Sequence, residues 1–155
     1  MELKDINEIL RDSQCIKTLT TTDEDGNPHT VLKSSLILWE NKFLAYGELL
    51  DGSHTYRNML RNYWGRKLVS IFLYHPSREI CCQIKGRPYK FVHDGPLWDH
   101  ILDSLWKWNP EAELSGVWMI KPLEIIAQDY DSRKKEEEKR VINQELWRRL
   151  RGLRS

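Results

Sequence analysis

Residues 52–58 bring together, in one short segment, several groups that can bind an anion. Their sequence is Gly-Ser-His-Thr-Tyr-Arg-Asn, and it follows an expected strand and opens an expected helix. The first backbone N–H groups of a helix have no partner within it, and the helix dipole makes that end attractive to negative charge. Ser53 and Thr55 add hydroxyl donors, His54 adds a ring N–H, and Arg57 adds a fixed positive charge. The segment is typical of a phosphate site, and a plain helix cap with surface polar residues is the open alternative.

A second polar group, Lys33-Ser34-Ser35, interrupts an otherwise apolar strand expected over residues 28–38. A lysine and two hydroxyls in sequence suit the polar part of a bound ligand. Because successive side chains of a strand point to opposite faces, a solvated position for Lys33 and Ser35 is the alternative.

The remaining polar residues do not form a recognisable catalytic or metal site. The histidines are scattered and lack the paired spacing of metal ligands. The three cysteines are an odd number, and two of them are adjacent, so they form neither a disulfide framework nor a CxxC pair. The sequence therefore predicts no metal site and designates no catalytic residue.

Alternating apolar residues and turn residues divide the chain into the elements that would position these groups. Strands are expected over residues 15–22, 28–38, 42–50, 67–74, 79–92 and 116–127. Helices are expected over residues 3–11, from an N-cap at Ser53 to a stop at Gly65, and after Gly95-Pro96.

The turns between the first three strands are too short for crossover helices, so these strands must be antiparallel. Closure of the sheet would remove its exposed edges, and Gly86 within the strand over 79–92 is typical of a bulge or barrel bend. The sequence thus predicts a mainly β (α+β) fold, a closed six-stranded antiparallel barrel with peripheral helices. We assign residues 1–130 to this barrel domain and residues 131–155 to a charged, helical C-terminal extension of the same domain.

Composition limits the classes of partner. The chain has 155 residues, of which 40% are hydrophobic and 30% charged, with a net charge of +1. This balance indicates a globular protein and favours neither nucleic acid nor a membrane as a partner. The first residues include acidic side chains and lack a long apolar run, so they are not expected to form a signal peptide, and with the cysteine pattern this predicts a cytoplasmic protein.

The order of motifs resembles the pyridoxamine 5′-phosphate oxidase-like FMN-binding split barrels. A T-x-D-x-D-G-x-P-H hairpin at residues 21–29 is followed by T-x-x-N at 55–58, I-K-G-R at 84–87 and D-G-P at 94–96. The similarity spans roughly residues 10–128. It implies a six-stranded antiparallel split β-barrel that binds FMN as a homodimer, with the flavin near the subunit interface.

The resemblance also implies which residues contact the flavin. The phosphate would be held at the helix start by Ser53, His54, Thr55 and Asn58, with Arg57 compensating for the Lys or Arg that many relatives carry where His54 stands. The ring and the ribityl chain would be contacted by Leu32 (through its backbone), Lys33, Ser34 and Ser35. Either Trp106 or Trp118 would add a contact from the other subunit.

Fold resemblance does not fix the substrate. One hypothesis is an FMN-dependent oxidoreductase that passes electrons or hydride between a reduced nicotinamide and a small-molecule acceptor. Authentic pyridoxamine phosphate oxidase activity is not expected, because the basic residues that would hold the substrate phosphate are not recognisable. The alternatives are a non-catalytic FMN-binding or electron-transfer protein, a haem- or deazaflavin-binding relative, and a nucleic-acid-binding barrel, which the charge balance disfavours.

Overall fold

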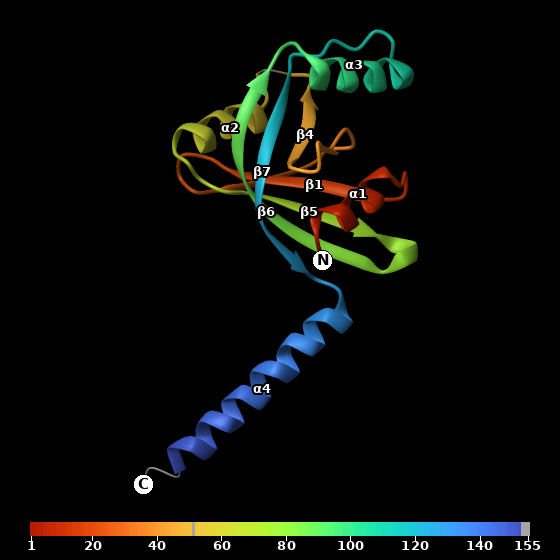
Figure 1. The fold of residues 1–155 in the computed structure, drawn as a ribbon. Helices are drawn as coiled ribbons and strands as arrows, with labels where there is room; N and C mark the ends of the chain where they lie inside the picture. The colour runs from red at the N-terminus through yellow and green to blue at the C-terminus, as the bar shows by residue number, and fades with distance from the viewer. Residues whose placement is uncertain (51, 153–155) are drawn as a thin grey trace.

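The computed structural model describes residues 1–50 and 52–152, which form an α+β domain with a long C-terminal helix (Figure 1). Its strands are β1 (Ile16–Thr22), β2 (Pro28–Leu32), β3 (Ile37–Trp39), β4 (Phe43–Glu48), β5 (Val69–His75), β6 (Ile80–Val92) and β7 (Gly116–Ala127). Its α-helices are α1 (Leu3–Arg11), α2 (His54–Trp64), α3 (Pro96–Trp108) and α4 (Tyr130–Gly152), and a 3-10 turn covers Pro76–Arg78.

All strands belong to one antiparallel sheet with the order β2-β1-β5-β6-β7-β4-β3. This is the architecture of a split barrel, with helices on its outside (Figure 1). The expectation of a closed barrel is wrong, because β2 and β3 are edge strands and do not pair with each other. The sheet has seven strands in the described structure, not six.

The additional strand arises because the strand expected over residues 28–38 is broken into β2 and β3. A turn at residues 33–36 separates them, and the N–H of Leu36 donates to the Lys33 carbonyl over 3.1 Å. The Lys17 ammonium of β1 donates to the Leu36 carbonyl at 3.1 Å and to the Ser34 carbonyl at 3.4 Å. The turn also lets Leu36 become fully buried in the core. The chain thereby crosses from one edge of the sheet to the other.

The long strands β6 and β7 form the centre of the split barrel. Their register shifts between Lys85 and Gly86 and again between Pro88 and Lys90. A Cβ on Gly86 would lie 2.6 Å from Ile120 Cγ2, so the close approach of β7 requires glycine there. The bulge expected at Gly86 is confirmed.

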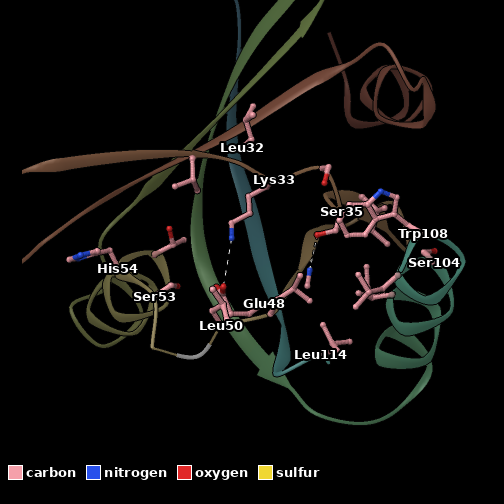
Figure 2. Close-up of a pocket in the computed structure, with 18 of the residues that line it drawn as sticks. Leu32, Lys33, Ser35, Glu48, Leu50, Ser53, His54, Ser104, Trp108 and Leu114 are labelled. Atoms are coloured by element: carbon pink, nitrogen blue, oxygen red, sulfur yellow. Dashed lines mark hydrogen bonds and ion pairs between the residues drawn. The ribbon is translucent and has the colours of Figure 1, made fainter. Parts of the chain in front are cut away.

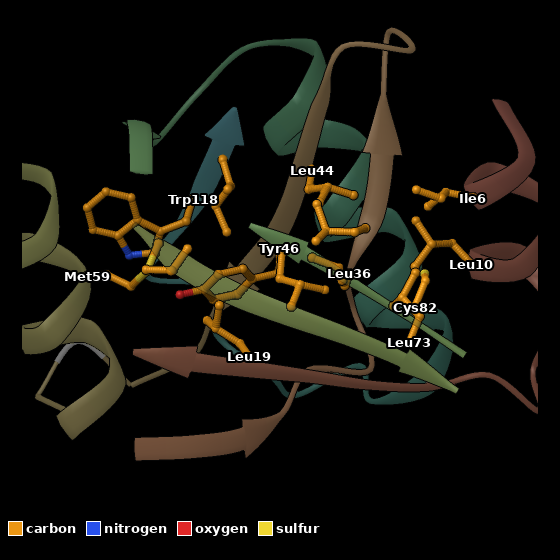
Figure 3. Close-up of a cluster of buried hydrophobic side chains, with 14 residues drawn as sticks. Ile6, Leu10, Leu19, Leu36, Leu44, Tyr46, Met59, Leu73, Cys82 and Trp118 are labelled. Atoms are coloured by element: carbon orange, nitrogen blue, oxygen red, sulfur yellow. The ribbon is translucent and has the colours of Figure 1, made fainter. Parts of the chain in front are cut away.

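The main core lies between the sheet, α1 and the inner face of α2 (Figure 3). Trp118, Tyr46 and Met59 are among its largest fully buried side chains. A smaller cluster joins Leu97 and Ile101 of α3 to Ala45 and Val117 on the sheet. This second cluster fixes α3 beside the end of β4.

Helix α4 extends away from the barrel and has no buried residue (Figure 1). The expected surface helix is therefore present, although residues 153–155 of the predicted extension lie outside the described residues. Within the described ranges, no helix combines the length and apolar character needed to cross a membrane.

Candidate functional site

A pocket of about 750 Å³ lies where the sheet remains open. Its wall comes from both sheet edges, from the turn at residues 33–36, from the end of β4, from the start of α2 and from α3 (Figure 2). The volume is within the range of cofactor and small-molecule sites. The break between β2 and β3 therefore creates the site as well as the extra strand.

The start of α2 forms one end of the pocket, and its local sequence explains its geometry. Ser53 is the N-cap, and its side-chain oxygen accepts a hydrogen bond from the Tyr56 N–H at 3.1 Å. Helix α2 ends at Gly65, as the sequence predicts. Ser53, His54 and Thr55 all line the pocket. The positive end of the α2 dipole and the first-turn N–H groups therefore adjoin this pocket.

Two other residues assigned to the phosphate do not line the pocket. An Arg57 guanidinium nitrogen lies 3.2 Å from His54 Nδ1 and thereby orients that ring. The buried Asn58 amide donates to Thr21 Oγ1 at 3.1 Å and ties α2 to β1. Arg57 thus contacts a residue that lines the pocket but does not line it itself, and Asn58 joins α2 to β1.

The middle of the pocket holds a buried pair of opposite charges. Lys33 Nζ lies 3.7 Å from Glu48 Oε1, and their side chains are only 15% and 3% exposed. The same ammonium lies 4.7 Å from the centre of the Tyr46 ring. Burial raises the pKa of the Glu48 carboxyl, and the Lys33 charge acts against that increase. Burial, followed by the charge of Glu48, also raises the pKa of Tyr46.

The turn between β2 and β3 supplies the other predicted polar residues. Leu32, Ser34 and Ser35 line the pocket together with Lys33. Ser35 Oγ accepts a hydrogen bond from the Gly47 N–H at 3.1 Å, which ties the turn to β4 (Figure 2). The predicted residues of this turn and of the α2 start therefore line one pocket, and their role in binding stays a prediction.

The far end of the pocket is mainly apolar and belongs to α3. Ile101, Ser104, Leu105 and Trp108 face it at the spacing of one helix side, and Leu114 from the following loop joins them. Trp108 is 78% exposed although it lines the pocket, so it lies at the rim.

The two tryptophans proposed for the flavin lie elsewhere. Trp118 is buried in the main core, where its ring centre lies 4.7 Å from that of Phe91. The Trp106 indole N–H donates to the Ala112 carbonyl at 3.2 Å. Neither residue lines the pocket of its own chain.

Sequence reasoning missed Trp108 and Glu48. The helical period through Ile101 and Leu105 could have found Trp108, because position 108 continues the same side of the helix. Glu48 lies at the end of a strand that directly precedes the anion-binding segment, but nothing local indicates its pairing with Lys33. No cluster of three potential metal ligands occurs among the described residues.

No protein-family model matches the sequence, and no curated protein matches it. Solved structures do match. An FMN-binding protein from Syntrophomonas wolfei subsp. wolfei aligns with a TM-score of 0.67 at 13% identity, over 81% of this chain and 84% of that one. A putative pyridoxamine 5′-phosphate oxidase from Listeria innocua aligns with a TM-score of 0.62 at 20% identity, over 81% and 96%.

HutZ, the haem storage protein of Vibrio cholerae, aligns with a TM-score of 0.58 at 16% identity, over 83% of this chain and 97% of its own. Proteins with different bound groups thus share this architecture, so the fold alone does not identify the ligand. The sheet order, the helix start beside the pocket and these structural matches agree on one conclusion. The chain has the split-barrel fold of the pyridoxamine 5′-phosphate oxidase-like proteins.

Proposed function

We propose that the chain is a flavoprotein that binds FMN in the pocket between α2 and α3. The observation that carries this proposal is the order of chemical environments along the pocket (Figure 2). A helix start suited to a phosphate is followed by the polar Lys33–Glu48 pair and then by the apolar side of α3. FMN has the same order, with a phosphate, a polyhydroxylated ribityl chain and a largely apolar ring system.

The activity that we propose is that of an FMN-dependent oxidoreductase. Bound flavin would supply the redox chemistry between a reduced nicotinamide and a small acceptor, while the chain's residues bind and orient it. The alternative is a non-catalytic FMN-binding or electron-transfer protein. The cytoplasmic location expected from the sequence stays a prediction.

Haem is a second candidate because two imidazoles lie at the pocket. The rings of His29 and His54 have centres 5.7 Å apart, and both residues line it. Against haem stands the buried Glu48 carboxyl, because the polar edge of haem carries propionates and offers no hydrogen-bond donor to a carboxylate. We therefore place FMN first. A deazaflavin with a phosphate-bearing ribityl chain would meet the same groups.

We also propose that the site is completed by a second copy of the chain. Three apolar residues that line the pocket are largely exposed in the single chain: Leu32 (72%), Leu50 (71%) and Trp108 (78%). Apolar side chains gathered at the rim of a pocket are typical of a surface that another molecule covers. A homodimer with the flavin near its interface would bury them.

The first test is the visible spectrum of protein purified from a host that makes both flavin and haem, with the released cofactor identified by mass spectrometry. We expect a flavin spectrum, or uptake of added FMN by the apoprotein. Bleaching by NADH or NADPH without oxygen would favour the oxidoreductase over the passive carrier. A haem spectrum without FMN uptake would overturn the proposal.

The second test compares FMN with riboflavin, which lacks the phosphate. Wild-type protein should bind FMN about tenfold more tightly, because the α2 start binds the phosphate. His54→Ala should reduce this preference, because it removes a polar side chain that lines the pocket. Arg61→Ala is the matched control, since this exposed cation lies near the other end of α2. Equal affinities for the two ligands in the wild type would mean that the phosphate lies elsewhere.

A further inference from the structure

Glu48 is a buried carboxylate with one oxygen that lacks a partner. Its residue is 3% exposed, and it belongs to the wall of the pocket. Oε1 faces Lys33 Nζ at 3.7 Å, and Oε2 makes no hydrogen bond within 3.5 Å to another described residue. The Ser53 and Tyr46 hydroxyls lie near enough to lower the pKa of the Glu48 carboxyl, but the buried Tyr46 hydroxyl also makes no hydrogen bond of that length. A buried carboxylate oxygen without a donor is costly, so such a group is typical of a site that receives its donor from a ligand.

The Lys33 ammonium makes this carboxylate suitable for binding. It lies beside Glu48 and over the Tyr46 ring, so it neutralises the carboxylate charge within the pocket. An ionised carboxylate only accepts hydrogen bonds, so Oε2 requires an O–H or N–H of the ligand. A phosphate oxygen or a haem propionate would place like charge against it.

The place of Glu48 along the pocket indicates which part of the ligand it meets. Figure 2 shows Ser53 and His54 on one side of the Lys33–Glu48 pair, and Ser104, Trp108 and Leu114 on the other. With a phosphate at the helix start and an apolar ring against α3, the group between them is the ribityl chain. In that orientation its hydroxyls would be the donors available to Glu48.

We infer that Glu48, with its charge balanced by Lys33, binds the ribityl hydroxyls and selects flavins that carry this polyol. The inference rests on the proposed function, because it takes FMN as the ligand. Glu48 would therefore determine which flavins bind. Its role would be in binding alone, without transfer of a proton or an electron.

The test measures the affinity of Glu48→Gln for three ligands by flavin fluorescence or calorimetry. FMN has both the ribityl chain and the phosphate, riboflavin has only the chain, and lumiflavin has neither but keeps the ring with its N3–H. We expect Glu48→Gln to weaken FMN and riboflavin by about tenfold, the value of one charged hydrogen bond, and to leave lumiflavin within about twofold. Glu124→Gln is the matched control, because this glutamate is exposed on β7 outside the pocket.

Glu48→Asp provides a second variant that keeps the charge beside Lys33 but withdraws the carboxylate by one methylene. It should show the same selective loss for riboflavin. An equal loss for all three ligands would overturn the inference, because it would mean that Glu48 supports the pocket or binds the ring. Unchanged riboflavin affinity would overturn it as well. Failure of the wild type to bind any flavin would instead remove the proposed function.

Discussion

A buried histidine joins three segments of the chain on the side of α1. His75 Nε2 lies 2.7 Å from Asp12 Oδ2, and His75 Nδ1 lies 3.3 Å from Ser77 Oγ. Ser77 Oγ also donates to the Gln14 side chain at 2.6 Å. The order Ser–His–Asp is that of a nucleophilic triad, but His75 is almost fully buried and none of these residues lines the pocket. We therefore interpret the cluster as a structural clamp between α1 and the β5–β6 turn.

This clamp makes stability depend on pH. The backbone N–H of Gln14, followed by the His75 side chain, lowers the pKa of Asp12 below its ordinary 3.8. A carboxyl whose pKa is lower in the folded state stabilises the fold above its unfolded-state pKa, and this contribution disappears as the pH falls through the folded-state pKa. We expect Asp12→Asn to be less stable than wild type at neutral pH, with a difference that shrinks in acid.

Urea unfolding at about pH 7 and about pH 3 measures this difference. Asp103→Asn, at an exposed position of α3, serves as the control and should follow the wild type at both values. If the difference in the free energy of unfolding between wild type and Asp12→Asn stays constant with pH, the Asp12 charge does not contribute to stability.

At the scale of elements, the ends of a helix could be predicted from neighbouring residues, whereas contacts between strands distant in sequence could not. The Ser53 cap and the Gly65 stop depend on residues within α2 or next to it, so the sequence shows where that helix begins and ends. The break at residues 33–36 depends on the Lys17 ammonium from β1 and the Gly47 amide from β4. Alternation within one segment cannot reveal groups that arrive from other strands.

The same distinction applies to the candidate site. Its two polar segments were visible as motifs because each is continuous in sequence. Glu48 becomes important only because the fold brings it to 3.7 Å from Lys33. Trp118 lies in the core, and the sequence could not distinguish this position from a ligand contact because burial and stacking favour the same kind of residue. Only the structure shows which residues from separate segments come together in the site.

Helix α4 gives a prediction at this scale. Its described side chains are not buried, so it makes little of the tertiary packing through which a helix and the rest of a protein stabilise each other. Truncation after Asp129 should therefore leave the melting temperature of the barrel and its FMN affinity unchanged within error. Circular dichroism should show the loss of helical signal alone. A lower melting temperature would mean that α4 packs on a barrel, either its own or that of a second copy.

At the scale of the whole molecule, the proposed dimer predicts that flavin binding and self-association are coupled. Trp108 is 78% exposed at the pocket rim, and a ligand bound between two copies would contact residues of both. If FMN binds only to the dimer, FMN binding stabilises the dimer by mass action. By the same linkage, the measured FMN affinity should fall when the protein is diluted and dimers dissociate. Sedimentation velocity with and without FMN should show the dimer strengthened by the ligand.

A pair of tryptophan variants isolates this coupling. Trp108→Ser should weaken both the dimer and FMN binding, since it removes a large apolar contact at the rim. Trp64→Ser is the matched control, because Trp64 at the end of α2 is 79% exposed and does not line the pocket. If Trp108→Ser loses FMN affinity while its dimer is unchanged, Trp108 contacts the flavin but not the second subunit. A wild-type monomer that binds FMN with an affinity independent of protein concentration would contradict the dimer, because the site would then be complete in one chain.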